Sequence, residues 1–160
     1  MIDIVELQAI TPSQANDILA LMKELNPDIP VTPGMLEAVV RTPDSHLFVA
    51  VEADCPCAPG SSSPARIVGC ATLCVYCSPT GRKASVEDVV VASACRRQHL
   101  GKRLIEHIIG FARRELAPVD LGLTSRPSRV AANSLYRSLG FTPKETNVYK
   151  MPLKASGESE

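Results

Sequence analysis

The chain has 160 residues, of which 45% are hydrophobic and 21% are charged. This length and composition are typical of a globular protein, and they suffice for one domain with its own core, which we expect over residues 1–152. The 17 basic and 17 acidic residues cancel, which argues against nucleic acid or an acidic membrane surface as a general partner.

The first half of the chain predicts a strand, two helices and a second strand. Apolar residues alternate in the first strand, return at helical spacing in the two helices, and dominate the second strand. Thr32 is the expected N-cap of the second helix. These four elements span residues 2–9, 12–25, 33–41 and 46–53. Residues 54–65 are rich in Pro, Ser, Gly and Cys and are predicted to form a flexible hairpin loop.

The second half begins with two strands, joined by the turn residues SPTG, and then alternates helices with strands. A long helix should start between Gln98 and Leu100, and a later helix should be capped by Ser128 and closed by Gly140. The sequence ETNVYKMPL predicts a last strand, followed by a frayed tail over residues 153–160. The other elements of this half span residues 66–77, 84–92, 98–116, 119–125 and 128–140.

This order of elements predicts an α/β protein with an α+β mixed sheet, in which helices cover the strands. The N-terminal sequence lacks the basic region of a secretory signal, and no apolar run is long enough to span a bilayer. The expected location is therefore cytoplasmic, away from the membrane.

The six cysteines are expected to be mostly reduced in that compartment. Two pairs of them could supply four zinc ligands: Cys55 with Cys57 and Cys74 with Cys77. However, TLCVYC is a strand pattern, in which residues three apart point to opposite faces. We therefore expect no metal site.

The sequence ACRRQHLGKRL places four basic residues around Gly101 at the expected start of the long helix. These residues are Arg96, Arg97, Lys102 and Arg103. The unpaired amides of a helix N-terminus attract phosphate, and nearby arginine and lysine side chains strengthen the attraction. A diphosphate fits this arrangement, although the solvated first turn of a surface helix would have the same composition.

Two segments together resemble the GNAT acetyltransferases. VEDVVVASACRRQHLGKRLIEHIIGFARR is similar to the first core motif of that family, with Arg96, His99 and Gly101 at three positions of its R/Q-x-x-G-x-G/A loop. AANSLYRSLGF is similar to the second core motif through Ala132, Leu135, Tyr136, Gly140 and Phe141. The resemblance implies a central mixed sheet of about six to seven strands flanked by about four helices.

The resemblance also implies acetyl-CoA as the co-substrate. The strand EDVVVA would pair with the amides of the pantetheine arm and supply an amide to the oxyanion, and the basic loop would bind the diphosphate. The residues implied for cofactor binding are Val89, Val90, Val91, Arg96, Arg97, Gln98, His99, Leu100, Gly101, Lys102, Asn133 and Tyr136.

Two residues are the candidates for catalysis. Tyr136 resembles the proton donor of the family, since a phenol can protonate the departing thiolate. VEDVVV resembles glucosamine 6-phosphate N-acetyltransferases, which favours Glu87 as the base that deprotonates the amine, with Asp88 or a water chain as alternatives. The chain departs from the family at His99, where a glycine is usual, and at Arg129, where many relatives have asparagine.

The sequence thus predicts direct transfer of acetyl from acetyl-CoA to a primary amine, most simply that of a small molecule. Transfer to a protein lysine or N-terminal amine is one alternative, and a module that binds acyl-CoA without turnover is another. Whether the chain forms a homodimer is left open. A covalent mechanism through Cys70 or Cys95 is disfavoured, because no histidine lies at a recognisable spacing from either.

Overall fold

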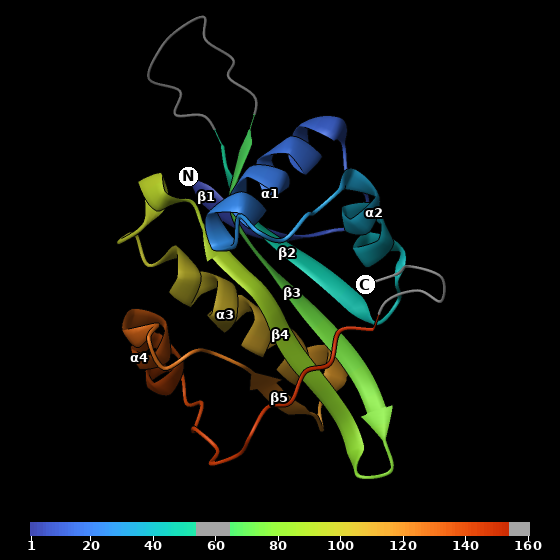
Figure 1. The fold of residues 1–160 in the computed structure, drawn as a ribbon. Coiled ribbons are helices and arrows are strands. Elements are labelled where there is room, and N and C mark those ends of the chain that lie inside the picture. Colours follow the sequence, from blue (N-terminus) through green and yellow to red (C-terminus); the bar gives the residue numbers. More distant parts are fainter. Residues whose placement is uncertain (54–64, 154–160) are drawn as a thin grey trace, which may run out of the picture.

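The computed structural model describes residues 1–53 and 65–153, which form a five-stranded mixed sheet in the order β1-β2-β3-β4-β5 (Figure 1). Strands β1 to β4 pair antiparallel, whereas β5 is parallel to β4. The strands are β1 (Ile2–Leu7), β2 (Ser45–Glu52), β3 (Arg66–Ser78), β4 (Gly81–Val91) and β5 (Asp120–Leu123).

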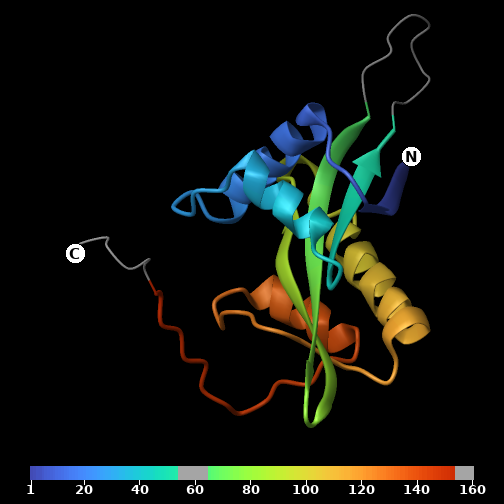
Figure 2. The same cartoon turned by 90° about the vertical axis from the view of Figure 1, so that its right-hand side faces the viewer.

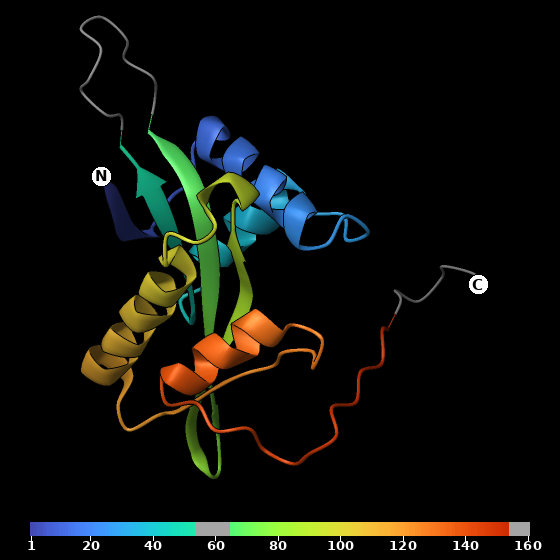
Figure 3. The same cartoon turned by 90° about the vertical axis from the view of Figure 1, so that its left-hand side faces the viewer.

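Four α-helices accompany this sheet: α1 (Pro12–Leu25), α2 (Pro33–Arg41), α3 (Leu100–Phe111) and α4 (Val130–Ser138). Helices α1 and α2 lie on one face of the sheet and α3 on the other, as the two side views show (Figures 2 and 3). A short 3-10 turn, η1 (Ser93–Cys95), precedes α3, and a π-helical segment, η2 (Ala112–Leu116), follows it.

Helix starts follow local chemistry. The hydroxyl of Thr11 accepts a hydrogen bond from the backbone N–H of Gln14, whose side chain accepts one from the backbone N–H of Thr11. This reciprocal pair satisfies two amides that the first helical turn leaves free. Thr32 caps α2 through the N–H of Met35, as its position before Pro33 predicts.

The two faces of the sheet bury separate apolar cores. The α3-side core contains Phe48, Leu73, Val86, Leu100, Leu104, Ile105, Ile108 and Tyr136 among its buried residues. The α1-side core contains Leu7, Ile18, Leu21, Leu36, Leu47, Val49, Cys70 and Val90 among its own. The sheet is therefore covered on both faces, so that its central strands are held rigidly from two sides.

The predicted mixed α/β sheet and the four helices are confirmed, whereas the number of strands is smaller than the six to seven expected. The last strand is absent: residues 142–153 pair with no strand of the described chain and run clear of the sheet (Figures 2 and 3). The exposed fractions of its apolar residues lie between 73% and 89%, for Val148, Tyr149, Met151 and Leu153. The alternating pattern that predicts a strand is local, whereas a strand forms only where the edge of another strand is free to pair with it. The outer strand on this side of the sheet, β5, has only four residues and so offers a short edge.

Three smaller predictions have different outcomes. Ser128 is not the cap of α4, because Arg129 occupies the N-cap position and makes no side-chain capping bond. Gly140 does follow the end of this helix with a positive φ of 95°, a conformation that glycine adopts easily. The predicted hairpin loop and frayed tail fall mainly on residues 54–64 and 154–160, which lie outside the described residues.

Within the described ranges, no helix has both the length and the apolar character needed to cross a bilayer.

Gly69 in β3 provides a test of the packing between β4 and α3. A Cβ atom at this position would lie 3.1 Å from the carbonyl oxygen of Val90 and 3.3 Å from Cδ1 of Leu104. We expect Gly69→Ala to lower the free energy of unfolding by ~1–3 kcal/mol, because the backbone oxygen cannot move aside easily. Gly122→Ala is the matched control, since nothing lies within 4 Å of the added Cβ there. Chemical denaturation of both variants measures the difference, and equal stabilities would contradict the proposed crowding.

Candidate active site

A β-bulge interrupts β4 at the centre of the candidate site. Cys70 of β3 pairs with Val90, whereas Thr72 pairs with Glu87, so two residues of β4, Asp88 and Val89, lie opposite one residue of β3. Asp88 has a φ of 52°, a left-handed conformation that aspartate tolerates better than most residues.

The bulge reverses the alternation of side chains along β4. Residues four apart on a regular strand point to the same face, but Val86 lies in the α3-side core and Val90 in the α1-side core. The valines that flank Val90, Val89 and Val91, pack against the α3-side core instead. The sequence pattern EDVVV therefore serves both faces within five residues.

The end of β4 is also free on its other edge. β4 pairs with β5 only from Lys83 to Val86, opposite Asp120 to Leu123. From Glu87 to Val91, β4 has no strand partner on the β5 side within residues 1–53 and 65–153. Backbone N–H and C=O groups on that edge can therefore pair with an extended ligand.

The loop that follows β4 carries the predicted diphosphate-binding residues. Arg97 and His99 both have positive φ angles, of 69° and 57°. His99 occupies the N-cap position of α3 and makes no side-chain capping bond. The first amides of α3 are therefore not satisfied by a cap, which is the state in which a helix N-terminus attracts an anion.

The predicted residues of this loop differ in how available their side chains are. Arg97, Gln98 and His99 are exposed, whereas Arg96 lies 3.6 Å from Glu24 and Lys102 lies 3.7 Å from Glu106 in ion pairs. The side chain of Leu100 is buried in the α3-side core, so only its backbone can face a ligand.

Gly101 lies where α3 comes close to β4 and α4. A Cβ atom there would be 3.7 Å from Leu135 and 3.9 Å from Val91. Both are ordinary contact distances, so internal packing alone does not require a glycine at this position.

Tyr136 lies on α4, and only 6% of its surface is exposed. Burial raises the pKa of its phenol, and the positive charge of Arg129 opposes part of that rise. The phenol therefore keeps its proton at neutral pH and can act as an acid. Its ring packs edge-on against Phe141, with centroids 6.2 Å apart.

Asn133, one turn before Tyr136, makes an internal contact. Its side-chain N–H donates a hydrogen bond of 2.9 Å to the carbonyl oxygen of Arg126. This bond holds the loop between β5 and α4 in place, so the side chain of Asn133 has a structural role independent of any ligand.

Two carboxyl groups stand side by side at the bulge. Glu87 accepts a hydrogen bond from the hydroxyl of Ser85. Although Asp88 is exposed as a residue, partial burial of its carboxyl group raises its pKa, and the negative charge of Glu87 raises it further. Asp88 is therefore harder to ionise than an ordinary aspartate.

Two thiols lie beside these carboxyl groups. Burial, followed by the charge of Asp88, raises the pKa of Cys70 to about 12. Burial also raises the pKa of Cys74, against a hydrogen bond with Ser45 that lowers it. At neutral pH Cys70 is therefore a thiol and a poor nucleophile. The two ranges of described residues hold no group of three or more His, Cys, Asp and Glu side chains that could bind a metal ion.

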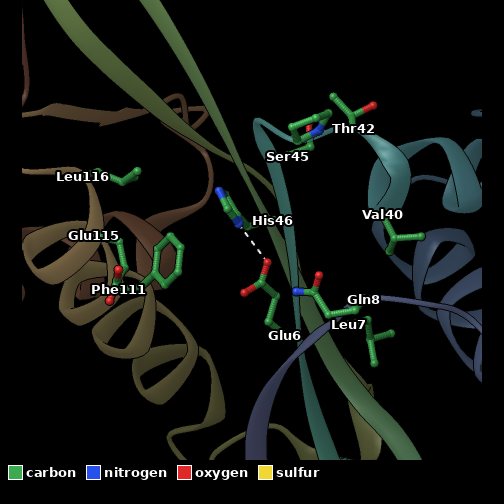
Figure 4. A pocket seen from close by; sticks show the side chains of 11 residues that line it. Glu6, Leu7, Gln8, Val40, Thr42, Ser45, His46, Phe111, Glu115 and Leu116 are labelled. Carbon is green, nitrogen blue, oxygen red and sulfur yellow. Dashed lines mark hydrogen bonds and ion pairs between the residues drawn. The ribbon is translucent and has the colours of Figure 1, made fainter.

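A separate hollow of about 410 Å³ lies near the far end of α3 (Figure 4). Here Nδ1 of His46 donates a hydrogen bond of 2.8 Å to Oε1 of Glu6, and the His46 ring packs against Phe111 with centroids 4.7 Å apart. None of the residues predicted for catalysis or cofactor binding lines this hollow.

The structure thus brings the end of β4, the basic loop and α4 together around one edge of the sheet. It adds one residue that the sequence did not point to, Glu24, as the partner of Arg96. It also gives Asp88, an alternative base from the sequence, a place in the bulge, and it puts the charge of Arg129 near Tyr136. Asp88 and Arg129 adjoin or lie within the motifs. Glu24 carries no local signal, because it lies 69 residues before its contact Ser93.

A family model agrees with this geometry. The model described as an acetyltransferase (GNAT) domain matches residues 43–143, which is more than half of the chain. The protein therefore belongs to the GNAT acetyltransferase family. No similar sequence is found among curated proteins.

Solved structures share the fold. An acetyltransferase from Trypanosoma brucei is 23% identical, with a TM-score of 0.69 over 96% of this chain and 100% of the other. Glucosamine-6-phosphate N-acetyltransferase from Arabidopsis thaliana is 19% identical, with a TM-score of 0.69 over 94% and 98%. AAC(6')-Iy, in complex with the bisubstrate analog CoA-S-monomethyl-acetylneamine, is 17% identical, with a TM-score of 0.69 over 96% and 99%.

The left-handed conformation of His99 generates a prediction. A residue with a Cβ atom is strained there and glycine is not, so we expect His99→Gly to raise the free energy of unfolding by ~1 kcal/mol. Thermal unfolding should then shift upward by about 2–4 °C. Gln98→Gly is the control, because Gln98 does not have a positive φ and glycine there only adds freedom to the unfolded chain. A lower melting temperature for His99→Gly would show that its side chain makes a stabilising contact.

Proposed function

We propose that the protein transfers the acetyl group of acetyl-CoA directly to the primary amine of a small molecule. The observation that carries this proposal is the bulged, unpaired end of β4, flanked by the uncapped N-terminus of α3 and by the buried phenol of Tyr136. Membership of the GNAT family supports acetyl transfer as the reaction class. The bisubstrate complex of AAC(6')-Iy, a neighbour in fold, supports an amine as the acceptor.

Binding of acetyl-CoA would use two kinds of group. The backbone of Val89, Val90 and Val91 would pair with the pantetheine amides, in the manner of an added strand. The diphosphate would be held by the first amides of α3 and by the loop from Arg96 to Lys102, where charge-assisted hydrogen bonds are strongest. Asn133 would support the site through the loop that it holds.

Three groups of the protein would then serve the transfer. A carboxylate at the bulge takes a proton from the acceptor ammonium, so that the amine nitrogen can form a bond to the thioester carbon. A backbone N–H near Val89 to Val91 stabilises the negative oxygen that results. As the carbon–sulfur bond breaks, the phenol of Tyr136 donates its proton to the departing sulfur. The extra proton on the new amide nitrogen is lost to water, and water returns a proton to the phenol.

Direct transfer is favoured over a covalent route through cysteine. Such a route needs a thiolate, and Cys70 with a pKa of about 12 remains protonated at neutral pH. Cys95 is buried in the α3-side core, with 8% of its surface exposed. Neither thiol is therefore assigned a chemical role.

The test of the function follows free thiol while acetyl-CoA is mixed with amino sugars, polyamines, amino acids or peptides. We expect a small amine to raise thiol release, and Tyr136→Phe to lower kcat by ~100-fold or more, because it removes the proton donor. Tyr149→Phe is the matched control, since 89% of Tyr149 is exposed and it lies far outside the core. Peptides as the sole acceptors would favour protein acetylation, and tight binding of acetyl-CoA without thiol release from any amine would favour a non-catalytic module.

The two carboxyl groups at the bulge are distinguished by substituting each in turn. We assign the base to Glu87 and expect Glu87→Gln to lower kcat by ~100-fold or more, with a smaller loss in Asp88→Asn.

The stability of the protein should also depend on pH through Asp88. Because the folded-state pKa of Asp88 is raised, the contribution of this carboxyl group to the free energy of unfolding is lost as pH rises through that pKa. Asp88→Asn should therefore be more stable than the natural protein at pH 7 but not below the pKa of an unfolded aspartate.

Measurements of kcat and of denaturation from pH 3 to pH 8 check both statements. A larger loss of kcat in Asp88→Asn than in Glu87→Gln would transfer the role of base to Asp88.

A further inference from the structure

A carboxylate of the first helix reaches the candidate diphosphate loop. Oε2 of Glu24, near the C-terminal end of α1, accepts a hydrogen bond of 2.9 Å from the backbone N–H of Ser93. The same oxygen lies 3.6 Å from Nη2 of Arg96. The carboxylate of Glu24 is therefore an anion of the protein itself that lies beside Arg96, the arginine that would bind phosphate.

We propose that Glu24 is a positioning residue that holds this loop through Ser93 and competes with the diphosphate of coenzyme A for Arg96. The inference rests on the proposed function and goes beyond it, because it names an element outside both sequence motifs as a determinant of cofactor affinity. It links α1, on one face of the sheet, to a loop that leads into α3 on the other (Figure 3).

The hydrogen bond to Ser93 fixes the start of the loop. Ser93 is the first residue of η1, and the preceding residue, Ala92, is tied to β3 by a bond of 2.8 Å from its N–H to the carbonyl oxygen of Val68. The loop is thus anchored to the sheet at one residue and to α1 at the next. α1 is a firm support, because Ile18 and Leu21 pack in the α1-side core.

The hydrogen bond and the charge of Glu24 have opposite effects on the affinity for the diphosphate. Arg96 has 61% of its side chain exposed and Glu24 has 36%, so both ions are near solvent and their attraction is modest. A diphosphate that binds Arg96 must displace the carboxylate of Glu24 from it and is then repelled by that nearby negative charge. The hydrogen bond thus favours cofactor binding by ordering the loop, whereas the carboxylate charge weakens it.

Two substitutions separate these effects. Glu24→Gln keeps a side-chain oxygen for the N–H of Ser93 but removes the charge, whereas Glu24→Ala removes both. We expect Glu24→Gln to bind coenzyme A roughly two- to fivefold more tightly than the natural protein at low salt, the range that an exposed ion pair provides. Glu24→Ala should bind less tightly than Glu24→Gln, because the loop loses its anchor.

Isothermal titration with coenzyme A, and with pantetheine as a ligand that lacks the diphosphate, measures these affinities. The gain in Glu24→Gln should be absent with pantetheine, should shrink as salt is added, and should be smaller when Arg96→Ala is also present. Glu37→Gln is the matched control, because Glu37 forms a similar exposed pair with Arg41, at 3.5 Å, on α2.

Unchanged or weaker binding of coenzyme A by Glu24→Gln, with binding by the natural protein intact, would overturn the competition while leaving the proposed function in place. An equal gain with pantetheine would also overturn it, since the effect would then not act through the diphosphate. If the natural protein does not bind coenzyme A at all, the proposed function fails, and this inference fails with it.

Discussion

The candidate site depends on one backbone feature, the bulge at Asp88 and Val89 in β4. The extra residue reverses the alternation of side chains, so that Val86 and Val90 serve opposite cores although they are four residues apart. It also lies within the stretch from Glu87 to Val91 over which β4 runs on without β5. A buried strand with a free edge is rare, because the backbone N–H and C=O groups on that edge need hydrogen-bond partners. The basic loop and α4 lie around the free edge of β4.

Burial sets the protonation states around this strand. Desolvation raises the pKa of the Tyr136 phenol, of the Cys70 thiol and of the Asp88 carboxyl group, so that each of the three holds its proton to a higher pH than usual. The partly buried site therefore holds a protonated phenol, a pair of carboxyl groups and, at Cys70, a protonated thiol. Charge is supplied locally by Arg129 beside Tyr136 and by the arginines of the loop, in a chain whose basic and acidic residues are equal in number.

Much of the fold could be predicted because its signals are local. Thr32 precedes a proline at a helix start, and its cap forms as the sequence predicts. The four helices and the first five strands follow from periodicity within each segment. The segment ETNVYKMPL has an equally clear strand pattern but finds no partner strand within the described chain. A pattern specifies which face a strand could bury, and only a partner edge makes it a strand.

The sequence by itself determined the order of most elements, the family and the residues of the two motifs, because each is encoded in a few neighbouring residues. The tertiary structure decided how these residues are presented. It set the left-handed backbone at Asp88 and His99, the burial of Leu100, and the contact between Glu24 and Ser93 across 69 residues of chain. These properties arise from strand register and from packing between distant segments, and such contacts leave no periodic signal in the sequence on either side.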